Sequence, residues 1–252
     1  EWYNTIQYSN DKFYFTNIPR ADSRTIYIEE YLKQYIQVVG KDGEFYNGKT
    51  TRSFNVEDGT DFTSNYDVSV IASEGYTAGK VKEIPGIVTS DSWIRAYNPD
   101  INFYTVTVIT SPHQHIKVNI MSNGEGYDIS TLEKLSYTDT SFKVPYNTVV
   151  KAELSADTGY TVGTLNGTSF TVKTDTTIKV VNEANANDYT ISMANLYKDI
   201  IDMSIEYKDK EYKDDTVINA KYGDTFRVIT KVLNDRYKFT GLDYNEDTIG
   251  LN

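Results

Sequence analysis

The two histidines of the chain, His113 and His115, have the spacing that comes nearest to metal chemistry. On a β-strand, residues i and i+2 point to the same face, so both imidazoles could bind one metal ion. The corresponding positions of a related upstream segment are Lys33 and Tyr35, so the pattern does not require a metal. We expect the pair at a surface strand edge, with a metal or interface role as the alternative, and we predict no metal site.

Three acidic clusters offer the oxygen ligands that Ca²⁺ prefers. They are Glu57-Asp58, residues 209–215 and residues 243–247. The last cluster has Asp, Asn and Asp at alternate positions, but Thr248 stands where an EF-hand needs glycine. We expect solvated acidic loops, with Ca²⁺ binding as the alternative.

Catalytic motifs are missing from the sequence. It has no HExxH or GxSxG, and residues 124–126 (GEG) lack the third glycine of a dinucleotide-binding loop. A Ser–His–carboxylate triad would have to use one of the two histidines, and no nucleophile elbow marks a serine. We predict a non-enzymatic protein with no catalytic residue and no cofactor.

The composition excludes further classes of protein. The chain has 252 residues, 36 acidic and 25 basic side chains, a formal charge of -11 and no cysteine. An acidic surface opposes nucleic-acid binding, which needs cations to displace counterions. Without cysteine there are no disulfides, thiolate zinc sites or cysteine nucleophiles. No apolar run reaches the ~18 residues of a membrane helix, so we expect no membrane insertion. We expect Glu1 to mark a processed product or a segment of something longer.

Aromatic residues are the remaining candidates for binding. Tyrosine occurs 22 times and tryptophan twice, and Trp93 is the residue that we single out as a candidate for contact with a glycan. Tyrosine is also a strong strand former that covers half-buried sheet faces. At protein interfaces it offers contact area at low entropic cost. We expect sheet packing to account for most of the rings, followed by interfaces and then by sugar binding.

The alternation of the sequence predicts that β-strands carry these residues. Apolar and polar residues alternate with a period of two in residues 25–29, 104–108, 116–120, 169–173 and 177–180. Turn residues separate these runs, which predicts an all-β fold of tandem small antiparallel β-sandwich modules. Residues 196–207 fit either a helix or a strand, and the repeat described next favours a short turn followed by a strand.

An internal repeat is the strongest pattern in the sequence. Residues 75–79 (GYTAG) match residues 159–163 (GYTVG) at a spacing of about 84 residues. A third, degenerate copy begins at Tyr189, and in it Arg236 and Tyr237 take the place of the Gly-Tyr pair. Repeats of about 80 residues can each own a core, so we expect separately folded modules. The expected divisions are an N-terminal segment at 1–24 (the end of a preceding repeat), repeat 1 at 25–100, repeat 2 at 101–186, and a degenerate repeat 3 at 187–252.

Six repeated residues are interpreted as structural. Each glycine follows a strand and should have a positive φ. Each tyrosine should pack across the end of its sandwich with its hydroxyl at the surface. Each aspartate precedes the last strand and suits a turn or an Asx hydrogen bond to the backbone. The six residues are Gly75, Tyr76, Asp91, Gly159, Tyr160 and Asp175.

Residues 142–180 carry a resemblance to known proteins through the blocks FKVPYNT, DTGYTVGTL, NGT and TDTTIKV. They resemble the tandem Ig-like or internalin-B-type β repeats of bacteriophage structural proteins and bacterial surface proteins, and residues 54–96 form a weaker copy. The resemblance covers residues 25–186 well. It implies Ig-like sandwiches in an extracellular or virion spacer, decoration or attachment element, and it implies no catalytic residues.

These observations lead to one expected function and two alternatives. We expect a bacteriophage virion structural protein, a fibre, head decoration or tail or collar accessory, that uses β repeats for assembly or host attachment. Its expected partners are other virion proteins, copies of itself and a host-surface glycan, but not nucleic acid. The alternatives are an adhesin or spacer on the bacterial cell surface and a carbohydrate-binding module of a secreted protein.

Overall fold

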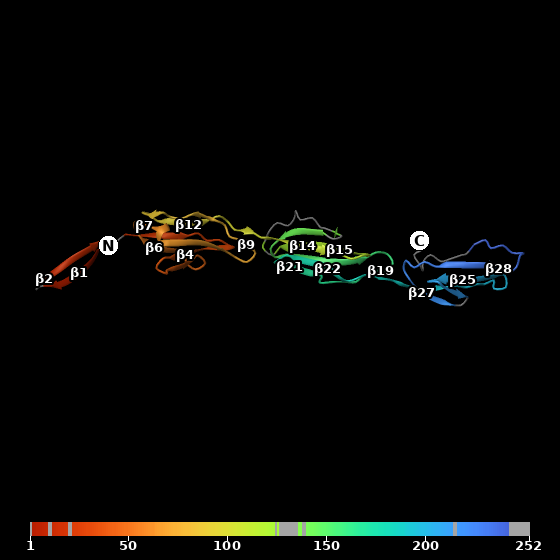
Figure 1. Cartoon of the computed structure of the whole chain (residues 1–252). Coiled ribbons are helices and arrows are strands. Elements are labelled where there is room, and N and C mark those ends of the chain that lie inside the picture. The colour runs from red at the N-terminus through yellow and green to blue at the C-terminus, as the bar shows by residue number, and fades with distance from the viewer. Residues whose placement is uncertain are drawn as a thin grey trace. The chain divides into compact units, whose positions relative to one another are not determined.

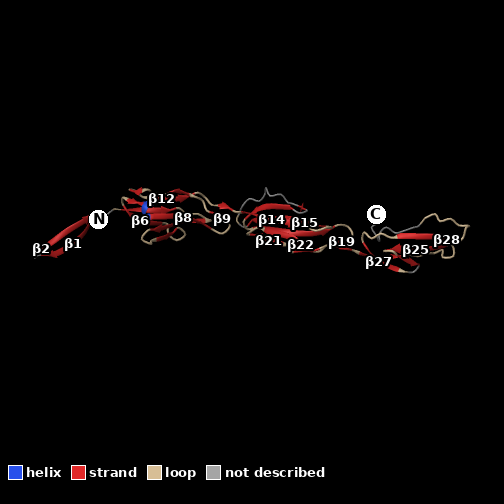
Figure 2. Ribbon diagram, viewed as in Figure 1, coloured by secondary structure: helices blue, strands red, loops and turns tan. Residues whose placement is uncertain are grey.

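Strands dominate the computed structural model. It describes residues 2–9, 12–19, 22–123, 125, 136–137, 140–213 and 216–241. The short helix α1 (Phe62–Asn65) stands out among the strands in Figure 2. The chain divides into two compact units, Glu1–Phe103 with Pro145–Asn147 and Tyr104–Val144 with Thr148–Asn252. The expected all-β class is confirmed.

An antiparallel hairpin precedes the first sandwich. Its strands are β1 (Trp2–Ser9) and β2 (Lys12–Pro19), paired from Trp2 with Pro19 to Ser9 with Lys12. The proposal that residues 1–24 end a preceding repeat stays a prediction.

The first sandwich has two facing sheets, whose strands can be followed in Figure 1. One sheet has the order β10-β12-β3-β6 and the other the order β5-β4-β8. Two short pairs, β7 with β11 and β9 with β13, complete it. The bounds are β3 (Ser23–Ile28), β4 (Gln34–Gly40), β5 (Phe45–Asn47), β6 (Ser53–Glu57), β7 (Thr60–Asp61), β8 (Tyr66–Ala72), β9 (Tyr76–Thr77), β10 (Val81–Glu83), β11 (Ile87–Val88), β12 (Ser92–Ala96) and β13 (Asp100–Ile101).

The core of the first sandwich follows from the period of two. Ile26 and Ile28 of β3 face Ile36 and Val38 of β4, and all four side chains are buried. Phe62 of α1 is also fully buried in this cluster. Alternate residues of each strand therefore fill the space between the two sheets.

The described residues of the second sandwich repeat this plan without a helix. Its sheets have the orders β17-β14-β22-β20 and β16-β15-β18-β21. Buried Val106 and Val108 from the first sheet meet Ile116 and Val118 from the second. The bounds are β14 (Phe103–Ile109), β15 (Gln114–Asn123), β16 (Ser136–Tyr137), β17 (Thr140–Pro145), β18 (Thr148–Ala156), β19 (Tyr160–Thr161), β20 (Thr164–Leu165), β21 (Ser169–Val172), β22 (Thr176–Asn182) and β23 (Asn185–Ala186).

One strand pair in each of these two sandwiches departs from antiparallel order. The last strand lies parallel to the first, β12 beside β3 and β22 beside β14. Strands such as β15 and β18, which pair from Gln114 with Ala156 to Asn123 with Thr148, are antiparallel as expected. The chain crosses to the other sheet between its first and last strands, which permits a parallel pair.

The third sandwich is smaller in the described residues. Its sheets are β24-β27 and β26-β25-β28, and its core holds Ile191, Ile205 and Ile218. A turn at residues 197–200 precedes β25, so the preferred prediction of a turn and then a strand is confirmed. The independent folding of the sandwiches stays a prediction. The bounds are β24 (Asp188–Ser192), β25 (Ile201–Tyr207), β26 (Lys210–Lys213), β27 (Val217–Lys221) and β28 (Arg227–Val232).

Candidate functional site

The repeated glycine of the Gly-Tyr segment meets a tyrosine from beyond its own sandwich. Gly75 and Gly159 have φ of +80° and +84°, as expected from the sequence. A Cβ on Gly159 would lie 2.2 Å from Cγ of Tyr222, and one on Gly75 would lie 2.1 Å from Cγ of Tyr146. Both the left-handed backbone and the close ring therefore require glycine.

In the second unit, Asn187 connects this turn to the third sandwich. Its N–H donates to the carbonyl of Gly159 at 2.9 Å, and its Oδ1 accepts from Oγ1 of Thr161 at 2.6 Å. Its carbonyl accepts from the N–H of Tyr222 at 2.9 Å. One residue thus satisfies polar groups on both sides of the connection, and β23 pairs with β19 beside it.

The same bonds recur in the first unit, to which residues 145–147 belong. Asn102 donates its N–H to the carbonyl of Gly75 at 2.9 Å and accepts from Thr77 Oγ1 at 2.6 Å. Its carbonyl accepts from the N–H of Tyr146 at 2.8 Å. We call each set a Gly-Tyr joint: Gly75, Tyr76, Thr77, Asn102 and Tyr146 form the first, and Gly159, Tyr160, Thr161, Asn187 and Tyr222 form the second.

Aromatic contacts add to the second joint. Tyr160 and Tyr222 meet edge to face, with centroids 5.6 Å apart and planes at 71°. Tyr189 lies 6.4 Å from Tyr222, and His113 stacks on Tyr160 at 3.9 Å. Edge-to-face pairs contribute about 0.5–1.5 kcal/mol beyond the area they bury. Tyr160 therefore packs against a ring of the following sandwich, a partner that the sequence did not identify.

A buried glutamine stabilises the second sandwich from inside. Gln114 is only 1% exposed, and its Oε1 accepts from the N–H of Gly163 at 2.7 Å. Its Nε2 donates to the carbonyl of Asn182 at 3.2 Å. A Cβ on Gly163 would lie 1.7 Å from that same carbonyl oxygen, so glycine is again required. The amide joins the Gly-Tyr segment to the last strand.

The first unit has the same glutamine clamp, which sequence patterns alone did not reveal. Gln34 accepts from the N–H of Gly79 at 2.8 Å and donates to the carbonyl of Tyr97 at 2.6 Å. A usable signal was present, since Gln34 precedes the matched residues 36 and 38 just as Gln114 precedes residues 116 and 118.

The two repeated aspartates bind the first strand of their own sandwich. Asp91 Oδ1 accepts from the N–H of Thr25 at 2.8 Å, and Asp175 Oδ1 accepts from the N–H of Thr105 at 2.7 Å. Each carboxylate therefore attaches the loop before the last strand to the strand that it pairs with in parallel.

His113 and His115 meet at one carboxylate. Nδ1 of His113 lies 3.2 Å from Asp157 Oδ2, and Nε2 of His115 lies 2.7 Å from Asp157 Oδ1. These bonds, that of His115 first, hold the pKa of Asp157 below its usual value against partial desolvation. The described residues contain no group of three or more His, Asp or Glu that could hold a metal ion. Both imidazoles are exposed, and they share this carboxylate beside the second joint.

Trp93 lies on the outer face of the first sandwich and is 40% exposed. The ring of Tyr27 stacks on it at 4.9 Å, and the guanidinium of Arg95 lies 5.0 Å from its centroid. Arg95 in turn pairs with Glu83 at 2.9 Å. These neighbours occupy ring surface that a stacked sugar would need.

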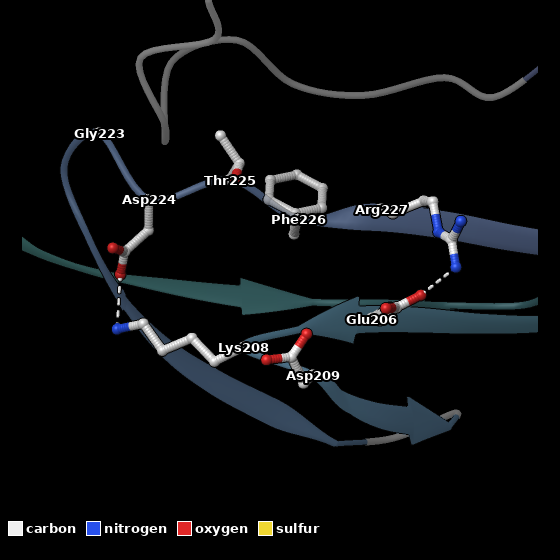
Figure 3. A pocket seen from close by; sticks show the side chains of 8 residues that line it. All are labelled: Glu206, Lys208, Asp209, Gly223, Asp224, Thr225, Phe226 and Arg227. Atoms are coloured by element: carbon white, nitrogen blue, oxygen red, sulfur yellow. Dashed lines mark hydrogen bonds and ion pairs between the residues drawn. The ribbon is translucent and has the colours of Figure 1, made fainter.

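A shallow cavity of about 580 Å³ lies in the third sandwich, and Figure 3 shows its ion pairs. Lys208 pairs with Asp224 at 3.1 Å, and Arg227 pairs with Glu206. Hydrogen bonds from Tyr207 and from a backbone N–H lower the pKa of Asp224 to about 2. The cavity is thus lined by paired charges. The lining residues are Glu206, Lys208, Asp209, Gly223, Asp224, Thr225, Phe226 and Arg227.

The structure describes the three acidic clusters of the sequence to different extents. Asp58 pairs with Nε of Arg24 at 2.7 Å. Residues 214–215 of the second cluster and all of residues 243–247 lie outside the described residues. The prediction of solvated acidic loops there, with Ca²⁺ binding as the alternative, stays untested.

Comparison with known proteins identifies no family. No protein-family model matches the chain, and no curated protein does. Among solved structures, the chain is similar to the Bacillus anthracis TIE protein, with 13% identity and a TM-score of 0.45. That alignment covers 92% of this chain and 51% of the other, so the chain spans about half its length. No helix among the described residues is long and apolar enough to cross a membrane.

Proposed function

We propose that the chain is a non-enzymatic structural protein of a bacteriophage virion. In this role it is a fibre, head decoration or tail or collar accessory, and its β sandwiches serve assembly or host attachment. Its partners are other virion proteins and copies of itself. The resemblance of residues 142–180 to tandem Ig-like repeats supports this proposal.

The observation that carries the proposal is the recurrence of the Gly-Tyr joint. The same three hydrogen bonds, of 2.6–2.9 Å, link glycine, threonine, asparagine and tyrosine in both units. A chain that only needed separate binding modules could use flexible linkers. A paired linker and a ring packed on glycine instead suit a structural protein whose neighbouring sandwiches are joined by specific contacts.

A cell-surface adhesin or spacer would benefit from the same joint, so the location of the protein is the discriminating measurement. Antibodies against the chain should label purified virions in immunogold electron microscopy, and its peptides should be found in those particles by mass spectrometry. Recovery only in the cell-wall fraction of the host would contradict the virion proposal and favour the adhesin.

The carbohydrate-binding alternative rests on Trp93. If that ring contacts a glycan, Trp93→Ala should abolish binding on a glycan array, and Trp93→Phe should retain part of it. The stacking of Tyr27 and Arg95 on Trp93 leads us to expect no glycan binding by this face.

A further inference from the structure

The end of the third sandwich has a turn with the same backbone hydrogen bond as the turns that end the other two, although Arg236 lacks the positive φ of Gly75 and Gly159. The N–H of Tyr237 donates to the carbonyl of Asn234 at 3.0 Å. In the second sandwich the N–H of Tyr160 donates to the carbonyl of Asp157 at 3.1 Å. Tyr237 is therefore the counterpart of Tyr160, but it is 53% exposed, whereas Tyr160 is half-buried.

This equivalence places two cations at joint positions. Arg236, just before the tyrosine, stands where the second joint has Gly159, and Lys238, just after it, stands where that joint has Thr161. Both side chains are exposed, and among the described residues the guanidinium of Arg236 forms no ion pair. At these two positions, large cationic side chains stand in place of the small, uncharged Gly159 and Thr161.

The start of the first sandwich carries the complementary change. The N–H of Asp58 donates to the carbonyl of Asp22 at 2.6 Å, as the N–H of Tyr222 donates to that of Asn187 at 2.9 Å. Asp58 therefore stands at the position of Tyr222, and Asp22 stands at the position of Asn187. Both residues are anionic where the second joint is neutral, and a small carboxylate stands in place of the large ring of Tyr222.

We propose that the third sandwich of one chain docks on the first sandwich of a second copy through a charged form of the Gly-Tyr joint. Arg236 then meets Asp58, and Lys238 meets Asp22. In the internal joints the residues at these positions touch directly, Gly159 with Tyr222 and the side chain of threonine with that of asparagine. The pair of Arg236 with Asp58 keeps one large and one small partner, as Gly159 and Tyr222 do, and both proposed pairs add opposite charges.

The charges around Asp58 favour a second cation. Arg24 bonds to Asp58 through Oδ1 only. This bond and the nearby Asp22 and Asp91 raise the pKa of Arg24, so three carboxylates surround one guanidinium. The acidic Asp235 lies beside Arg236, at the place that Glu74 holds in the first joint.

Contacts between unlike ends generate an open, head-to-tail series of copies. The inference rests on the proposed structural role, but not on the virion setting. A chain that fails to self-associate would leave the immunogold result standing, and a chain absent from virions could still associate.

Sedimentation velocity of the full chain over a concentration series tests the docking. We expect association that strengthens at low salt, because exposed charges are screened by ions. Arg236→Glu with Lys238→Glu should raise the dissociation constant about tenfold or more, since like charges then face each other. A matched control is Lys210→Glu with Lys213→Glu, which makes the same change in net charge at exposed positions of β26 and should leave association unchanged.

A charge swap and a cross-link test which residues of the two copies meet in the proposed contact. Adding Asp22→Lys and Asp58→Lys to the Arg236→Glu and Lys238→Glu chain should restore association. Because the chain has no cysteine, Asp58→Cys with Arg236→Cys should also form a disulfide-linked ladder of copies on oxidation. A monomer at all concentrations, a control as weak as the variant, or the absence of a ladder would overturn the proposal.

Discussion

Gln114 is almost completely buried, yet both ends of its amide are paired inside the second sandwich. Alternation places it on the same strand face as Ile116 and Val118, so its inward direction could be predicted from the sequence. Its partners could not, because Gly163 lies 49 residues away and donates through its backbone. The same limit applies to the histidines, whose shared Asp157 is 42 and 44 residues away.

Gln114→Leu tests the glutamine clamp at the residue scale. The variant keeps much of the side-chain volume but leaves the N–H of Gly163 and the carbonyl of Asn182 without this partner. We expect it to lower the free energy of opening of the second sandwich by about 1–3 kcal/mol. Native-state amide exchange of Val118 and Val150 measures this. Lys117→Gln, on the exposed face of β15, should change it by less than about 0.5 kcal/mol, and an equal loss there would contradict the clamp.

Asp224 makes the stability of the third sandwich dependent on pH. Its folded-state pKa of about 2 lies below the usual aspartate value of about 3.9, so the unfolded chain binds the proton first. The stabilisation is therefore present above about pH 4 and is lost as the pH falls toward about 2. Asp224→Asn should destabilise the sandwich at neutral pH and flatten this acid limb. An acid titration followed by the amide signals of Ile205 and Ile218 tests this.

The control for this pH dependence is Asp209→Asn. Asp209 is an exposed residue of the neighbouring turn with a φ of 60°, a conformation that asparagine tolerates well. Its substitution should leave the acid limb in place. If both variants flatten it equally, the low pKa of Asp224 is not its source.

At the scale of elements, periodicity predicts strands better than it predicts their partners. The run at 25–29 overlaps β3, which ends at Ile28, and the run at 104–108 lies in β14. Nothing in their alternation shows that each strand pairs in parallel with the last strand of its sandwich. Likewise, the repeated glycines of the sequence predict the turns and their positive φ. The ring that packs on Gly159 comes from Tyr222 on a later repeat, and a local pattern cannot contain it.

Gly159→Ala separates the two reasons for glycine in the joint. The methyl group must both adopt a left-handed φ and displace the ring of Tyr222. Gly59 has nearly the same φ, +82°, and a Cβ added there would meet no atom within 4 Å, so Gly59→Ala carries the backbone cost alone. We expect Gly159→Ala to shift the amide signals of Thr161 and Tyr222 strongly. If these signals change as little as those of the residues flanking position 59 in the control, the ring does not pack directly on the glycine.

At the scale of the whole molecule, the described residues hold three hydrophobic clusters, one for each sandwich. The repeat made three cores predictable from the sequence, because each copy carries its own alternating strands. The joint could not be predicted from the sequence, because its residues lie outside the three hydrophobic clusters. Each of them is recognised only through its contact with a partner far away in the chain. Within the second unit, the connection between the second and third sandwiches is therefore made by named contacts.

The central claim is that the second joint holds the second and third sandwiches in a defined arrangement. The absence of cysteine allows two spin labels to be placed cleanly, through Lys151→Cys on β18 and Lys231→Cys on β28. Distances between the labels should form one narrow distribution in the otherwise unchanged chain and a broad one after Tyr222→Ala. Equally broad distributions in both chains would contradict the claim and leave the sandwiches as independent beads.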